Sequence, residues 1–150
     1  MESDIKTTDE KKRNPYKMRV ILRSISRNIS TPAANTTILD DIISNEAEGM
    51  HINTMEDYIC ALRKIYVVED LPAWSPKLRS KTAIRTSEIR HFTDPAIAAY
   101  FLGASAKDLE YDSNTFGLLF ESMVIRDLRV YTQALNGDLY QYNDKNGFGS

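Results

Sequence analysis

Basic side chains recur at regular spacing in two segments of this 150-residue chain. Arg19, Arg23 and Arg27 follow one another at four-residue intervals, which places them on one face of a helix. A polar turn further along the chain carries three more cations, Lys77, Arg79 and Lys81. Because guanidinium and ammonium groups contact nucleic-acid phosphates, we expect weak, non-specific DNA binding if the two segments converge.

Acidic residues argue against a surface that reads DNA. Residues 36–59 carry six acidic side chains and no Lys or Arg, and the helix expected to enter a groove begins with Glu56 and Asp57, which would repel phosphates. The net charge of −2 supplies no global positive field. A contact with a protein partner, or a purely structural dimerisation role, therefore remains open beside DNA binding.

Few residues are placed to perform catalysis. Glu121 is a single carboxylate in an apolar helix start, and one carboxylate cannot hold Mg²⁺. His51 and His91 stand 40 residues apart and are expected to be surface or turn residues, while Cys60, the only cysteine, is expected to be a packing residue. No glycine is followed by lysine and no G-x-G-x-x-G occurs, so the sequence predicts no metal site, no ATP site and no cofactor.

The composition is that of a soluble globular protein, with 42% hydrophobic and 27% charged residues. The longest apolar run, residues 96–102, is far too short to span a bilayer. The first 15 residues lack the apolar core of a signal peptide, so the expected location is the cytoplasm.

Apolar residues at helical spacing predict three helices in the first half of the chain, and the buried side of the third is expected to consist of Met55, Ile59, Leu62 and Tyr66. The first begins at Pro15, the second follows a threonine cap at 36 or 37 with acidic residues 40 and 41 in its first turn, and the third opens at Asn53 with Glu56 in a capping box. Strand-prone segments at 65–68 and 83–92 enclose the basic turn, and Trp74 is expected to anchor this hairpin by burial. After a mobile arm at 1–13, residues 14–92 thus match a winged helix-turn-helix, with a plain helical bundle as the alternative.

A second unit is expected at residues 93–150. Asp94 and Pro95 open a short, wholly buried helix that Gly103 ends, and Ser105 caps another short turn. A long helix is predicted at about 113–135, followed by a strand at 139–142 and a hairpin turn at 143–147. The side chains expected to face inward from the long helix are Phe116, Leu119, Phe120, Met123, Val124 and Leu128. One strand and a stub cannot complete a sheet, so this unit is expected to be truncated.

Four blocks of the chain closely resemble one protein family: RVILRSISRN (19–28), MEDYICALRKIYVVEDLPAW (55–74), RHFTDPAIA (90–98) and GLLFESMVIRDLRVY (117–131). They are similar to bacterial and archaeal predicted ATPases that join an N-terminal AAA-type P-loop module to a C-terminal domain of unknown function, and the likeness covers about residues 14–148. The resemblance implies a helix-rich α+β (α/β) chain in which a winged helix precedes an incomplete restriction-endonuclease-like α/β core. It makes Glu121 the first acid of a Glu…Asp…Glu-x-Lys metal pattern whose other members this sequence does not reach.

The resemblance also implies a role. The chain would be a non-enzymatic C-terminal accessory region that binds DNA weakly, or binds a protein partner such as its own ATPase module, through the winged helix. The alternative is an inactive fragment of a metal-dependent nuclease. ATP and Mg²⁺ would serve only a full-length relative, because the P-loop module is absent from this sequence.

Overall fold

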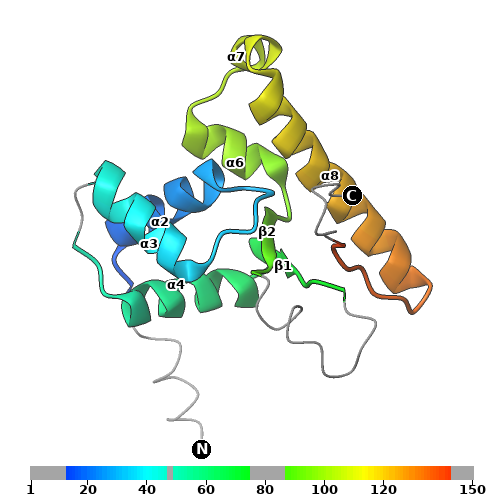
Figure 1. The fold of residues 1–150 in the computed structure, drawn as a ribbon, viewed down its shortest axis with the longest axis horizontal. Coiled ribbons are helices and arrows are strands. Elements are labelled where there is room, and N and C mark those ends of the chain that lie inside the picture. Colours follow the sequence, from blue (N-terminus) through cyan, green and yellow to red (C-terminus); the bar gives the residue numbers. More distant parts are fainter. Residues whose placement is uncertain (1–12, 47–48, 75–86, 143–150) are drawn as a thin grey trace, which may run out of the picture.

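The computed structural model describes residues 13–46, 49–74 and 87–142. Within these ranges the chain forms six helices and one two-stranded antiparallel sheet, which confirms the helix-rich α+β class. Figure 1 shows the elements in chain order, which are α2 (Pro15–Arg27), α3 (Asn35–Glu46), α4 (Ile52–Lys64), β1 (Val68–Leu71), β2 (Ile89–Phe92), α6 (Pro95–Leu102), α7 (Ala106–Tyr111) and α8 (Ser113–Ala134).

The first helix begins where the sequence predicts. Pro15 occupies its first turn, and the side chain of Asn14 caps it by accepting a hydrogen bond from the Tyr16 N–H at 2.9 Å. The chain leaves this helix through Ser30, whose φ of 58° lies in the left-handed region. The inward side of α2 supplies the centre of the hydrophobic core with Val20, Ile21, Leu22 and Ile25.

Two helix starts differ from the prediction. α3 begins at Asn35, so the acidic residues 40 and 41 lie in its middle rather than in its first turn. α4 begins at Ile52 with His51 as its cap, because His51 Nδ1 accepts a hydrogen bond from the Asn53 N–H at 3.2 Å. The capping box at Glu56 is wrong, since that carboxylate accepts a hydrogen bond from Asn35 Nδ2 instead (3.2 Å).

Two side chains that the sequence predicts to be packing residues of the third helix, Cys60 and Tyr66, do not pack inward. The helix ends at Lys64, so Tyr66 lies beyond it, exposed and with a φ of 57°, and Tyr58 is the tyrosine that packs inward. Cys60, expected to be a packing residue, is exposed. The physical reason is the helical period, since Met55, Ile59 and Leu62 already fill the inward side.

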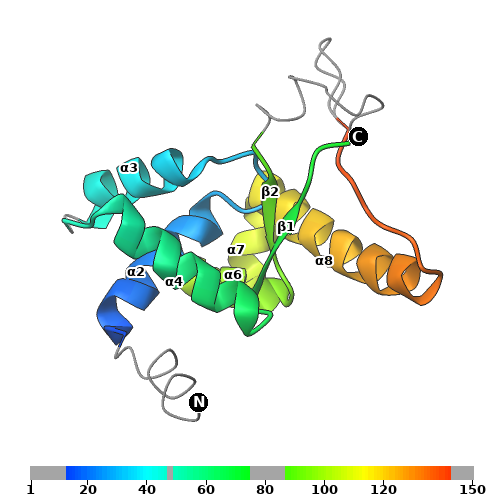
Figure 2. The ribbon, with the colours of Figure 1, turned by 90° about the horizontal axis from the view of Figure 1, so that it is seen from below.

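The predicted hairpin is present, with shorter strands. β1 pairs antiparallel with β2 in a register that places Val68 opposite Phe92 and Leu71 opposite Ile89. The basic turn, and with it Lys77, Arg79 and Lys81, lies outside the described residues. Figure 2 shows the hairpin lying between helices α2–α4 on one side and α8 on the other.

The prediction that Trp74 anchors the hairpin by burial is wrong. Its side chain remains 49% exposed and packs against Tyr142, with ring centroids 6.0 Å apart. The anchor is Gln141, whose buried amide donates hydrogen bonds to the carbonyls of Leu71 (3.3 Å) and Ser87 (3.0 Å). The strand expected at 139–142 is reduced to one parallel bridge between Ala73 and Gln141. Two backbone hydrogen bonds form this bridge, from the Trp74 N–H to the Gln141 carbonyl (2.7 Å) and from the Gln141 N–H to the Pro72 carbonyl (2.9 Å).

The last three helices share the core of the first three. Ala98 of α6 and Leu119 of α8 belong to the same hydrophobic cluster as α2 and α4, and α6 packs mainly on α2 (Figure 1). The division into units at residue 93 stays a prediction. The expectation that α6 is wholly buried is wrong, because only Ala98 is buried and Tyr100 points to solvent. No helix in the described ranges is long and apolar enough to cross a membrane.

Candidate functional site

The basic face of α2 lies against the acidic side of α3. Arg27 binds two carboxylates, with Nη2 2.7 Å from Asp41 Oδ2 and Nη1 3.0 Å from Glu46 Oε1. Arg23 shares Glu46, with Nη1 3.1 Å from its Oε2. Two of the three arginines predicted to contact phosphates are therefore engaged within the protein.

The electrostatics of this contact follow from the pairing. Burial raises the pKa of Asp41, but the hydrogen bonds and charge of Arg27 outweigh it, so the pKa lies below its ordinary value. Arg19 is exposed and makes no ion pair with any residue that the structure describes. The pairing was not predicted because Asp41 was assigned to the first turn of its helix rather than to the face that meets α2, and Glu46 was given no partner.

Glu121 lies on the surface of α8. It follows Phe120 directly in the sequence, and desolvation raises the pKa of its carboxyl group. Among the residues that the structure describes, no three His, Cys, Asp or Glu side chains gather closely enough to hold a metal ion. The assignment of Glu121 as a nuclease carboxylate stays a prediction.

Several large apolar side chains of α8 that were predicted to face the core are exposed instead. Leu119 and Ser122 are buried, whereas Phe116, Phe120 and Leu128 are exposed. At about 100° per residue, Phe120 and Leu128 fall on the side of the helix opposite Leu119 and Ser122, and Phe116 lies at the edge of that side. This apolar stripe consists of Phe116, Phe120, Val124, Leu128, Tyr131 and Leu135, and its five largest side chains are 42–82% exposed.

A buried polar cluster joins α8 to the hairpin and to the turn after α2. His91 Nδ1 lies 3.3 Å from the hydroxyl oxygens of both Ser30 and Ser122, and all three side chains are buried. Burial is the main reason that the His91 pKa falls to about 4, and the charge of Arg129 lowers it further against the opposing effect of Asp70. The prediction that His91 is a surface or turn residue is wrong, because its position in β2 faces the core. These serine–histidine contacts join β2 to the turn after α2 and to α8.

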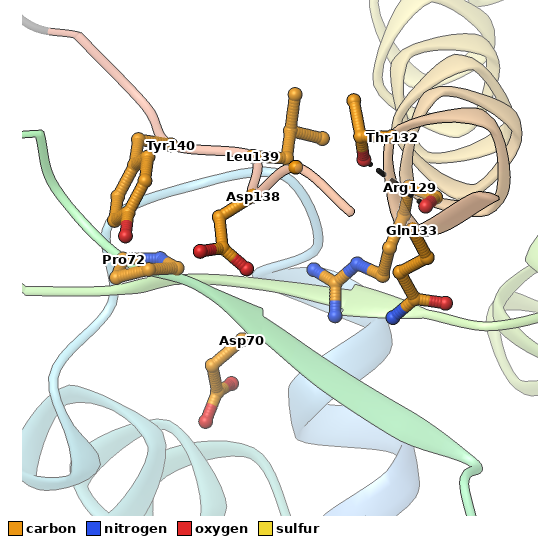
Figure 3. Close-up of a pocket in the computed structure, with 9 residues that line it drawn as sticks. Asp70, Pro72, Arg129, Thr132, Gln133, Asp138, Leu139 and Tyr140 are labelled. Carbon is orange, nitrogen blue, oxygen red and sulfur yellow. Dashed lines mark hydrogen bonds between the residues drawn. The ribbon is translucent and has the colours of Figure 1, made fainter. Parts of the chain in front are cut away.

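A second polar region is the small cleft between the end of α8 and the segment after it, drawn in Figure 3. It encloses about 260 Å³ and is lined mainly by Arg129, Gln133, Asp138 and Tyr140. Arg129 is already paired with Glu69 at 2.8 Å. Asp70 points away from Asp138 (Figure 3) and binds Arg90 Nε at 2.8 Å and also Arg63. Pockets for drug-sized ligands measure about 300 Å³ or more, so a volume this small, with Arg129 and Asp70 already paired, favours a structural role.

Comparison with known proteins gives one family. The model described as "Domain of unknown function (DUF8612)" matches residues 1–108, which is more than half of the chain. The match includes helices α2 to α6, and α8 lies beyond it. No curated protein and no solved structure matches the chain.

Proposed function

The chain belongs to the DUF8612 family, and we propose that it is a non-enzymatic interaction module that pairs with a second copy of itself through α8. The observation that carries this proposal is the apolar stripe, which faces away from the core along the helix. Contiguous apolar surface of this kind is uncommon on a monomer and marks a site of association.

The exposed area suits a modest dimer. If a complete large side chain offers about 200 Å², the exposed fractions of Phe116, Phe120, Leu128, Tyr131 and Leu135 amount to about 550–600 Å² per copy. Two copies would then bury about 1,100–1,200 Å², close to the lower limit of specific interfaces. A dissociation constant in the micromolar range is consistent with that area.

The order of side chains along the stripe favours a second copy in antiparallel orientation. The spacings between successive members read nearly the same in both directions, so a two-fold axis near residues 125 and 126 would place Phe120 opposite the partner copy's tyrosine at 131. Phe116, which stacks on Phe120 with ring centroids 6.2 Å apart, would meet the partner copy's leucine at 135. Asp127 lies at the edge of the stripe, where its carboxylate accepts a hydrogen bond from Arg126 Nε (3.0 Å).

A winged helix followed by an incomplete nuclease-like core remains our proposal for the finer fold. It is supported by the order of elements, since three helices packed on one another lead directly into an antiparallel hairpin. Weak duplex binding through the basic residues is less favoured, because Arg23 and Arg27 would have to leave Glu46 and Asp41 to contact phosphates. A role for the chain as an accessory region of an AAA-type ATPase, or as a nuclease fragment, is a proposal that rests on the sequence resemblance.

Sedimentation equilibrium over about 1–200 µM protein tests the pairing. We expect a reversible dimer for the wild type and a monomer for the double variant Phe116→Ser, Phe120→Ser, with an unchanged circular dichroism spectrum. Ile65→Ser is the matched control, because Ile65 is also an exposed apolar side chain but lies at the end of α4, away from the stripe. A monomeric wild type at the highest concentration, or a dimer in the double variant, would contradict the proposal.

The orientation has its own measurement. A nitroxide on Asn114→Cys, in a Cys60→Ser background, lies near one end of α8. At 1.5 Å per residue, antiparallel pairing about the proposed axis separates the two labels by about 35 Å, and parallel pairing brings them to within about 20 Å. Double electron–electron resonance distinguishes these two distances.

A further inference from the structure

A groove of about 490 Å³ lies between α2 and α6, on a different part of the molecule from the stripe. Two classes of side chain meet in it, guanidinium groups from α2 and aromatic rings from the end of α6. Its lining is formed by Arg19, Arg23, Tyr100, Phe101, Leu102 and Gly103. In Figure 1 the two helices lie side by side, and each contributes one wall.

The ring of Tyr100 is exposed to solvent and packs against one neighbouring ring. Its side chain is 78% exposed, although it belongs to an otherwise apolar helix. The neighbouring Phe101 packs partly against the core and contacts the Tyr100 ring edge-on, with centroids 5.1 Å apart and an interplanar angle of 86°. The helix ends at Gly103, whose φ of 67° suits the left-handed cap, so the ring stands at a defined helix terminus.

The positive charge in the groove is only partly compensated. The ion pairs to α3 join Arg27 to Asp41 and Glu46, and Arg23 to Glu46. Arg23 keeps 43% of its side chain exposed, and Arg19 has no carboxylate partner in the described part of the chain. Arg19 therefore brings an unpaired guanidinium group to the groove that Tyr100 also lines.

We infer that this groove binds single-stranded nucleic acid, with one base stacked on Tyr100 and the adjoining phosphate held by Arg19, which has no ion pair among the described residues. An exposed aromatic ring beside guanidinium groups is the arrangement by which proteins bind unpaired bases without sequence preference. A duplex suits the groove less well, because its bases are stacked on one another and offer no free face to the ring. DNA and RNA single strands share the chemistry that the groove recognises.

The site is expected to be weak and only mildly salt-dependent. Arg19 can neutralise about one phosphate, so log K should fall against log salt with a slope of about −0.7 for a single strand. The net charge of −2 adds no long-range attraction. A steep slope would indicate a different, more extensive cationic surface.

Fluorescence anisotropy with labelled oligothymidylate and oligouridylate of about twelve nucleotides tests the inference. We expect binding of at least one strand at low salt, weaker binding of a duplex of equal length, and about a 5- to 100-fold loss with Tyr100→Ala. Tyr111→Ala is the matched control, because Tyr111 is equally exposed on the neighbouring α7 but lies outside the groove. Arg19→Ala should remove most of the salt slope, whereas Lys64→Ala, which removes an exposed cation at the end of α4, should leave it unchanged.

Three results would overturn the inference: no binding of either strand at low salt, tighter binding of the duplex than of the single strands, or equal losses for Tyr100→Ala and Tyr111→Ala. Failure of this inference can be distinguished from failure of the dimer proposal, because Phe116 and Phe120 do not line the groove and the variant Phe116→Ser, Phe120→Ser leaves it intact. That variant should bind the oligonucleotide with unchanged affinity per chain.

Discussion

His91 is the buried side chain whose protonation should matter most to the folded state. Its pKa is about 4 when folded, against about 6.5 for an exposed histidine. The unfolded chain therefore takes up a proton that the folded chain excludes, and the free energy of unfolding should decrease as the pH falls from about 6.5 to 4. The full effect is on the order of 3 kcal/mol. Asp41 acts in a lower window, since its depressed pKa removes stability only as the pH falls below about 4.

Urea unfolding of the wild type and of His91→Gln at pH 7, 6, 5 and 4.5 measures this linkage. We expect the wild type to lose stability steeply over this range and the variant to lose little, whatever the variant's stability at pH 7. The comparison therefore depends on the two slopes rather than on absolute values. Equal slopes would mean that His91 is accessible to protons in the folded state.

Trp74 illustrates how burial decides the effect of a substitution. Because its ring is half exposed and contacts mainly Tyr142, Trp74→Ala should reduce the free energy of unfolding by about 1–2 kcal/mol, less than the 3–5 kcal/mol of a buried tryptophan. Circular dichroism during urea unfolding is the measurement. Met55→Ala provides the contrast, since Met55 is fully buried in α4 and should cost about 2–5 kcal/mol.

At the scale of elements, the contact between α2 and α3 has an apolar part, which faces the core, and an ion-paired part at its rim. Ile38 and Ile42 face the core, while the carboxylates of Asp41 and Glu46 hold Arg27 at the rim. The pairs are partly exposed, so their contribution to stability is modest and sensitive to salt. The same contact determines how much positive charge α2 can offer to a ligand.

Arg27→Gln should lower the free energy of unfolding by about 1 kcal/mol at low ionic strength, because it removes the cation paired with Asp41 and one of the two cations paired with Glu46. Urea unfolding in low salt and in about 0.5 M NaCl is the measurement, and the loss should shrink in the higher salt. Arg19→Gln is the control and should change stability by less than about 0.5 kcal/mol, since Arg19 has no ion pair among the described residues. A loss that salt does not reduce would point to packing of the Arg27 stem instead.

At the scale of the whole molecule, one core supports two outward-facing features. The hydrophobic cluster runs from α2 and α4 through the hairpin to Ala98 and Leu119. The stripe on α8 and the groove at the end of α6 lie on its periphery, so each can be altered by surface substitutions without emptying the core.

Self-association predicts that thermal stability depends on protein concentration. Binding that favours the folded state raises the midpoint of unfolding, so the Tm of the wild type should increase between about 2 and 200 µM. The Tm of Phe116→Ser, Phe120→Ser should not depend on concentration. Differential scanning calorimetry with reversible unfolding is the measurement, and a wild-type Tm that stays constant would contradict the dimer.

Local chemistry determined much of the secondary structure from the sequence alone. Pro15, Asp94 and Ser105 mark helix starts, and Gly103 and Asn136 mark helix ends, because caps and left-handed positions depend on neighbouring backbone groups only. The antiparallel hairpin and the helix-rich α+β class follow from the same local signals. Periodicity likewise identified Met55, Ile59 and Leu62 as core residues.

Only the tertiary structure decided which side of each helix faces the core and which charges meet. An amphipathic pattern marks an apolar side but not what covers it, so Phe116, Phe120 and Leu128 were predicted to face inward with Leu119, although only Leu119 of these four is buried. The pairing of Arg27 with Asp41 and Glu46, and the burial of His91 between Ser30 and Ser122, join residues from separate elements. Such contacts depend on how the elements pack in space, and no local spacing in the sequence specifies that packing.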